Sequence, residues 1–149
     1  MHAPNPFKSY RQVATQTAPP GQLVLMLFDG ALKSLDCALL GFSNPDFAER
    51  NLIVHNNLSR ATDIVRELNG SLDHAAGGQL AETLANLYTF FEQRITESNI
   101  KKSPHGIHEI IPMIRELRDA WCAMLAQEGA GAGADQLPQT ATATNRLTV

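Results

Sequence analysis

Histidine, cysteine and acidic side chains are the residue types here that could support catalysis or metal binding, and their spacing favours neither. His105, His108 and Glu109 place three potential metal ligands near the expected start of a helix. Solvent-exposed side chains explain this group better, because no Cys-x-x-Cys pair and no Glu-x-x-His motif accompanies it. Cys37 and Cys122 are far apart in the sequence. We therefore expect no catalytic residues, no metal and no cofactor.

His55 is the one residue for which a specific enzymatic or signalling role can be stated. A histidine on the second helix of a four-helix bundle can accept a phosphoryl group. Such domains usually carry Lys three residues after the histidine and Gly four residues after it, where this chain has Leu58 and Ser59. A solvent-facing or hydrogen-bonded histidine is therefore favoured, and histidine phosphotransfer stays an alternative.

Charge and composition exclude several further classes. The chain has 149 residues, 12 basic and 15 acidic, and a net charge of −3 spread evenly along its length. Phosphate-driven nucleic-acid binding is therefore not expected. The pair Gly77-Gly78 follows no strand, so it does not resemble a phosphate-binding loop.

The apolar segments are too short to enter a membrane. The longest run, residues 23–28, ends at Asp29 and falls well below the ~20 residues that span a bilayer. Residues 1–22 contain no apolar run that could serve as a signal-peptide core. Two cysteines are too few for a disulfide framework, and both lie in apolar stretches, which indicates buried free thiols in a reducing compartment. We expect a soluble, cytoplasmic protein without membrane insertion.

Apolar periodicity predicts four helices, over about 20–40, 45–69, 79–99 and 104–127. Gly41 and Asn44-Pro45 are expected to end the first helix, Ser103 to cap the fourth, and Pro112 to kink it. The apolar stripes comprise Leu23, Leu27, Ala31, Leu35 and Ala38; Val54, Leu58, Ala61, Val65, Leu68 and Leu72; Leu80, Leu84, Leu87, Phe91 and Ile95; and Ile107, Ile110, Ile114, Leu117, Trp121 and Leu125.

These elements predict an all-α fold, an antiparallel up-down four-helix bundle over residues 20–128. Residues 1–19 are interrupted by prolines and allow one short helical turn, so we expect an N-terminal cap segment. Residues 129–149 are rich in Gly, Ala and Thr, which predicts a disordered tail.

The first helix carries more apolar residues than a core-facing stripe needs, because residues 23–28 are apolar almost all the way round. Two interpretations are compatible: a helix buried at the centre of the bundle, or an exposed groove for another helix that residues 4–18 cover until a partner arrives. On the second helix, Ile53 and Ile64 share a face outside the main stripe and could line a second groove. Packing against a neighbouring helix is the simpler reading for them. The same holds for Tyr88 and Phe90, which suit a core or its rim.

Several short motifs, taken in order, resemble one known family. The opening Asn5-Pro-Phe-Lys-Ser-Tyr10, the stretch 17–31 with its Leu-Met-Leu-Phe-Asp-Gly run, and Asn57-Leu-Ser-Arg-Ala61 resemble the FliS-type, flagellin-specific export chaperones of bacterial flagella. Further matches follow at 72–73, 77–81, Leu84-x-x-Leu87-Tyr88, Arg94, Asn99 and Leu117–Trp121. The resemblance covers about residues 4–125. Phe28 and Phe90 stand where Tyr is common in the family, Thr83 stands where Asn is common, and Pro112 is unusual.

The resemblance implies a cytoplasmic chaperone, not an enzyme, that binds the disordered C-terminal segment of flagellin. It also implies that the chaperone prevents premature polymerisation and delivers flagellin to the export gate of the flagellar type III secretion apparatus. The N-terminal segment with Tyr10 is implied to lie near the binding site and to rearrange when flagellin binds.

We expect the partner-binding surface to comprise Phe7, Tyr10, Val13, Leu23, Met26 and Leu27, with Ile53 and Ile64 as outer members. An alternative partner is another flagellar protein, such as an anti-sigma factor or a flagellin-level regulator. An exposed groove could also form a homodimer when no cargo is present.

Overall fold

Four long helices make up the part of the chain that the structure describes. The computed structural model describes residues 20–136, and it places side chains from 21 to 129. The helices are α2 (Pro20–Phe42), α3 (Phe47–Gly70), α4 (His74–Lys101) and α5 (His105–Gln136), and residues 20–136 contain no strand. The predicted all-α bundle is therefore confirmed.

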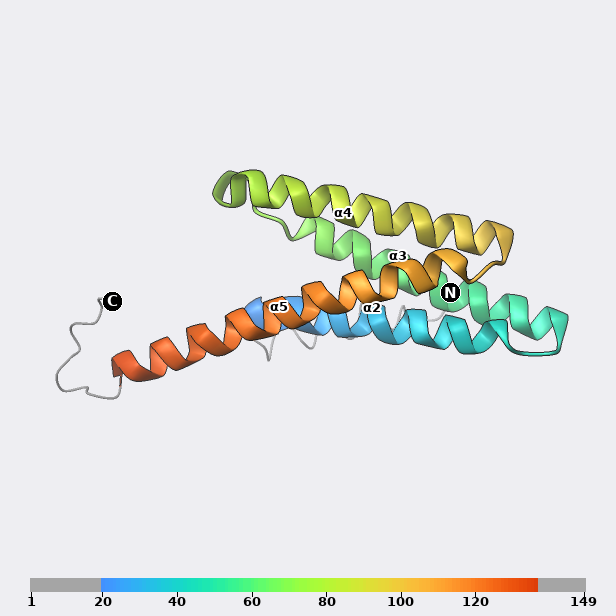
Figure 1. Cartoon of the computed structure of the whole chain (residues 1–149), viewed down its shortest axis with the longest axis horizontal. Coiled ribbons are helices and arrows are strands. Elements are labelled where there is room, and N and C mark those ends of the chain that lie inside the picture. Colours follow the sequence, from blue (N-terminus) through green and yellow to red (C-terminus); the bar gives the residue numbers. More distant parts are fainter. Residues whose placement is uncertain (1–19, 137–149) are drawn as a thin grey trace, which may run out of the picture.

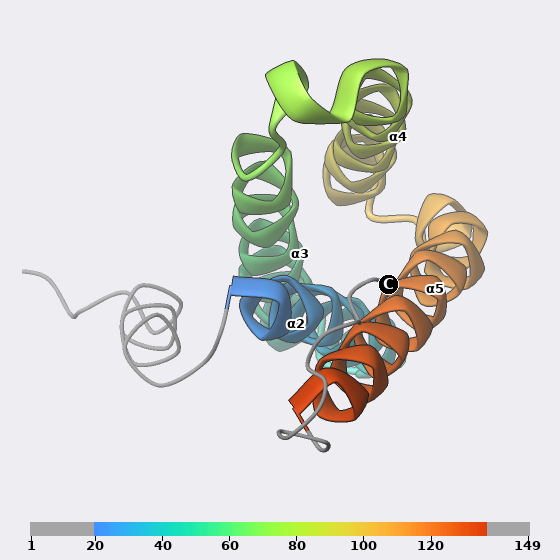
Figure 2. The same ribbon diagram turned by 90° about the vertical axis from the view of Figure 1, so that its left-hand side faces the viewer.

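The helices pack as a ring of neighbours, with α2 against α3, α3 against α4, α4 against α5 and α5 against α2. Figure 1 shows α4 uppermost, with α3 running from the end of α2 up toward α4, and Figure 2 shows the four helices around a common centre. The α2–α3 contact is the most extensive and the α4–α5 contact the least. Sequential helices joined by short turns give the up-down topology.

Local side-chain caps explain where α3, α4 and α5 begin. The carboxylate of Asp46 accepts a hydrogen bond from the Glu49 amide at 2.8 Å, and that of Asp73 accepts one from the Ala76 amide at 3.0 Å. The hydroxyl of Ser103 accepts a bond from the His105 amide at 3.3 Å, as its predicted capping role requires. Each cap satisfies an amide that has no partner inside its helix.

The core is built from the predicted stripes. Leu58, Val54 and Ala61 on α3 are fully buried, as are Ile107 and Ile110 on α5. Tyr88 and Phe90 behave as expected for core and rim positions, because Tyr88 is buried and Phe90 packs against the core.

Several local predictions were wrong. The third helix begins at His74 rather than after Gly77-Gly78, because the Asp73 side chain caps it there. Gly41 does not itself end the first helix: α2 continues to Phe42, and the predicted Asn44-Pro45 lies in the turn that follows. Gly41 packs so closely against α3 that a Cβ there would lie 2.6 Å from Ile53 Cγ2. Leu80 is exposed, two residues after Gly78 breaks the helical path of α4 with φ of 52°. Cys37 and Cys122 are free thiols, but both are half-buried, so the expectation of full burial does not hold.

The fourth helix is longer than predicted. α5 runs through Pro112 without ending, and Pro112 itself is exposed. It continues to Gln136, past the predicted end near Gln127, through an Ala-Gly repeat in which alanine favours the helix. The rest of the predicted tail, residues 137–149, and the predicted cap segment, residues 1–19, lie outside the described residues.

Leu58→Ala should lower the free energy of unfolding by about 2–5 kcal/mol, because it removes buried carbon atoms and leaves a cavity. Leu52→Ala is the matched control, since Leu52 lies on the same helix with 60% of its surface exposed. Denaturant titration of both variants measures the difference. Equal losses would show that the α3 stripe is wrongly placed in the core.

Alkaline stability tests the burial of Tyr88. Burial raises the pKa of Tyr88 from 10.0 to about 12, because the ionised phenolate is poorly solvated there. The unfolded chain therefore loses this proton first, and stability should fall as pH rises from about 10 to about 12. The loss should approach about 2 kcal/mol at the upper end of that range.

The control is Tyr88→Phe, which removes the titrating hydroxyl and keeps the ring. Unfolding free energies of both proteins are compared across the same pH range, so that titration of other groups cancels. Parallel curves would contradict the burial of this hydroxyl.

Candidate partner-binding groove

A groove with a volume of about 540 Å³ runs between α2 and α3, and we call it the α2–α3 groove. It joins the two helices with the most extensive mutual contact. Its lining is apolar at the base apart from the buried Ser34, and polar at the edges. It consists of Met26, Leu27, Asp29, Gly30, Lys33, Ser34, Cys37, Asn57, Arg60 and Ile64.

The base of the groove is formed by largely buried side chains of α2 and α3. Leu27 and Ile64 are 2% and 3% exposed, and Met26 beside them is half-buried. Gly30 faces Ile64 so closely that a Cβ at position 30 would lie 3.3 Å from Ile64 Cδ1. The missing side chain therefore leaves room above Ile64 that an alanine would begin to fill.

The edges of the groove carry polar groups that differ in their pairing. Asp29 accepts a hydrogen bond at 2.7 Å from Arg118 Nε on α5, which ties its charge to a third helix. Asn57 donates to the Ile53 carbonyl at 2.9 Å. Lys33 and Arg60 are exposed, and neither makes a hydrogen bond or ion pair with another residue that the structure describes.

Three of the predicted binding residues come together in this groove: Met26, Leu27 and Ile64. Leu23 is half-buried on α2 but does not line the groove. Ile53 is also half-buried and packs against Gly41 near the C-terminal end of α2. The apolar surplus on the first helix therefore divides between the core and one groove shared with α3.

The remaining predicted binding residues, Phe7, Tyr10 and Val13, lie outside the described residues. Their part in binding stays a prediction.

The polar lining of the groove was not among the predicted binding residues. Met26, Gly30, Lys33 and Cys37 are spaced by three or four residues along α2, and so share one face of a helix. That spacing is present in the sequence, but it mixes apolar, polar and charged residues, so apolar periodicity does not indicate it. Nothing in the sequence indicated that Asn57 and Arg60 of α3 would lie opposite them.

His55, His105 and His108 form no common site in the part of the chain that the structure describes. His55 is exposed, and its Nδ1 lies 3.1 Å from Asn99 Nδ2. His105 and His108 are exposed, while Glu109 lies within 2.6 Å of the Arg94 guanidinium. Within the described residues, no group of three His, Cys, Asp or Glu side chains is arranged to hold a metal ion.

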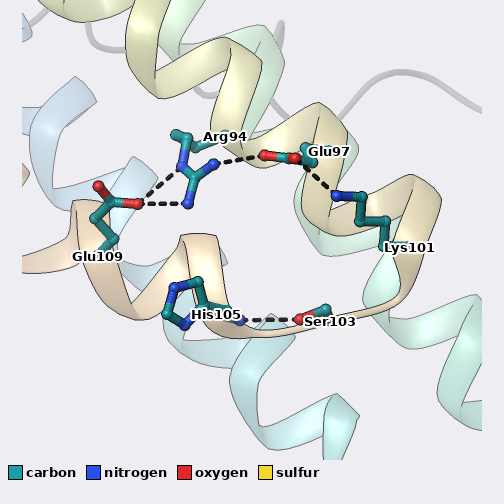
Figure 3. A network of polar contacts seen from close by, with 6 residues as sticks. All are labelled: Arg94, Glu97, Lys101, Ser103, His105 and Glu109. Carbon is teal, nitrogen blue, oxygen red and sulfur yellow. Dashed lines mark hydrogen bonds and ion pairs between the residues drawn. The ribbon is translucent and has the colours of Figure 1, made fainter.

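Arg94 instead centres a network that ties the end of α4 to the start of α5 (Figure 3). It bridges Glu109 on α5 and Glu97 on α4, and Lys101 pairs with Glu97 at 2.9 Å. The hydrogen bond from Lys101, followed by the charges of Lys101 and Arg94, holds the pKa of Glu97 below its usual range. These residues orient the α4–α5 turn, which is a structural role.

Apolar side chains also remain exposed outside the groove. Five large ones are between 60% and 77% exposed, namely Leu40, Phe47, Leu52, Leu80 and Ile100. Ile100 belongs to a shallow recess of about 650 Å³ along the outer face of α4, formed by α4 alone. No helix within residues 20–136 is long and apolar enough to cross a membrane.

A helical bundle with an apolar inter-helix groove and further exposed apolar side chains is typical of proteins that bind another polypeptide segment. Comparison with known proteins identifies the family within that class. The family model "Flagellar protein FliS" matches residues 3–128. The chain belongs to the FliS family of flagellar secretion chaperones.

Individual relatives agree over most of both chains. The flagellar secretion chaperone FliS of Bacillus subtilis is 31% identical over 128 residues, covering 86% of this chain and 92% of the relative. Those of Salmonella typhimurium and Vibrio cholerae are each 31% identical, covering 81% and 76% of this chain and 90% and 84% of the relatives. Membership of a chaperone family points to a role other than catalysis.

Proposed function

We propose that this protein is a cytoplasmic chaperone that binds the C-terminal segment of flagellin before export. It keeps that segment from polymerising prematurely and delivers it to the export gate of the flagellar type III secretion apparatus. Membership of the FliS family supports the chaperone role, and the α2–α3 groove is the observation that supports binding of a helical segment.

The groove suits the apolar face of an amphipathic helix. The apolar part of its base consists of Leu27, Ile64 and part of Met26, and its edges are polar. A helix inserted there would bury its apolar side chains and leave its polar side chains exposed to solvent. Ordering a disordered segment costs about 2–5 kcal/mol or more of the gross interaction free energy. A tight complex therefore requires contacts beyond one groove.

Exposed apolar side chains elsewhere on the bundle could supply these contacts. Leu40, Phe47 and Leu52 lie near the α2–α3 turn, while Leu80 and Ile100 lie near opposite ends of α4. A long cargo that wraps around the bundle can reach several of these places, whereas a single short helix cannot. We infer that the groove anchors one part of a longer bound segment.

Isothermal titration of the full chain with the C-terminal segment of flagellin from the same organism tests the proposal. We expect tight 1:1 binding with a large negative heat-capacity change, which reports apolar burial coupled to folding of the cargo. Absence of both heat and co-elution would contradict flagellin binding. Titration with other flagellar proteins, including regulators, would then identify the alternative partner.

Met26→Gln tests whether the groove is the anchor. Placing a polar amide at the groove base should weaken flagellin binding about tenfold, because burial of a methionine contributes about 1.5 kcal/mol or more. Met124→Gln is the matched control, since Met124 is also half-buried but lies on α5 outside the groove lining. Equal affinities of the two variants would place the anchor elsewhere.

The N-terminal segment provides an independent test through Tyr10. Tyr10→Ala should weaken flagellin binding while leaving the melting temperature nearly unchanged, if the segment of Phe7, Tyr10 and Val13 contributes to the binding surface. Thermal unfolding and titration are measured on the same preparation. A large drop in melting temperature with intact affinity would make Tyr10 a packing residue.

A further inference from the structure

Two unpaired cations face the α2–α3 groove, one from each of its helices. Most lysines and arginines between residues 21 and 129 are engaged: Arg66, Arg94, Lys101 and Arg118 pair with carboxylates, and Arg50 and Lys102 donate hydrogen bonds. Among these described residues, only Lys33, Arg60 and Arg115 have no such partner. Two of the three, Lys33 on α2 and Arg60 on α3, line the groove.

The acidic residue of the groove does not neutralise them. The Asp29 carboxylate is held at 2.7 Å by Arg118 of α5, so its charge is already compensated. The groove therefore combines an apolar base with a net positive edge. Such a surface attracts a carboxylate that stands beside an apolar face.

A buried hydroxyl adds a second polar feature. Ser34 lines the groove with 3% of its surface exposed, and its hydroxyl makes no hydrogen bond to another residue in the described part of the chain. Buried polar groups usually have a partner. A polar atom of a bound segment would supply one.

The chain's own terminal segments lack the matching acidic side chains. Residues 1–19 contain Lys8 and Arg11 and no Asp or Glu, and residues 137–149 contain Arg146 and no acidic residue. Their cations would meet like charge at Lys33 and Arg60. Charge complementarity thus favours a segment of another polypeptide.

We propose that Lys33 and Arg60 select the part of the cargo that enters the groove: an amphipathic segment with Asp or Glu beside its apolar face. This inference rests on the proposed function, because it specifies which portion of a bound flagellin segment occupies the groove. Lys33 and Arg60 act as specificity-determining residues that fix the register and orientation of the segment, while Leu27 and Ile64 supply apolar contact.

The test pairs charge removal on the chaperone with charge removal on the cargo. The probes are the flagellin C-terminal segment and a version whose Asp and Glu residues are replaced by Asn and Gln. Each is titrated at low and high salt into the full-length wild-type chain, the Lys33→Gln/Arg60→Gln double variant, and Arg115→Gln. Arg115 is the matched control because it is an exposed, unpaired cation outside the groove.

At low salt the double variant should bind the natural segment about fivefold to tenfold more weakly than wild type, and Arg115→Gln less than twofold. Salt should weaken wild-type binding and have little effect on the double variant, because screening removes the same attraction. The segment without Asp and Glu should bind the wild-type chain and the double variant with the same affinity. That affinity should equal the affinity of the double variant for the natural segment.

Three results would overturn the proposal, and they separate its failure from that of the proposed function. If the double variant and Arg115→Gln show the same fold-loss in affinity for the natural segment, binding depends only on the net charge of the protein. Lys33 and Arg60 then have no specific role in selecting the segment. If Met26→Gln weakens binding but the double variant does not, the groove docks cargo through apolar contact alone. If wild type binds neither segment, flagellin binding itself fails, and this inference fails with it.

Discussion

The close packing of α2 against α3 is the contact on which the rest of the structure depends. Two glycines on α2 make it possible, because Gly30 meets Ile64 and Gly41 meets Ile53 at distances that leave little or no room for a side chain. The Asp46 cap starts α3 directly after the short turn, which sets the two helices antiparallel. The base of the groove forms where the packed faces of these helices meet solvent.

The fourth helix, α5, fixes this pair in place by polar contacts with α2. Arg118 of α5 reaches Asp29, and the Trp121 indole donates to the Gly21 carbonyl at 2.9 Å at the start of α2. Because Arg118 satisfies Asp29, the α5 contact also sets the electrostatics of the groove. Because the Asp29 carboxylate is paired with Arg118, the uncompensated charges that line the groove are those of Lys33 and Arg60.

Much of the fold was predictable because apolar residues recur with helical period. The stripe through Val54, Leu58 and Ala61 is fully buried, and Ser103 caps the fourth helix as expected. The failures arose where tertiary packing or a backbone break overrode a local signal. Gly41 continues the helix because it packs against Ile53, and Leu80 is exposed close to the break at Gly78.

The sequence by itself determined the all-α class, the number of long helices, the core stripes and, through ordered motifs, the family. It also led us to expect Met26, Leu27 and Ile64 in the partner-binding surface, because the first helix carries more apolar residues than its core stripe needs and Ile64 lies outside the stripe of the second helix. Only the tertiary structure decided that these residues share one groove and that Lys33, Asn57 and Arg60 border it. The physical reason is that helical periodicity places residues on a face of one helix, whereas a groove depends on the crossing and register of two helices.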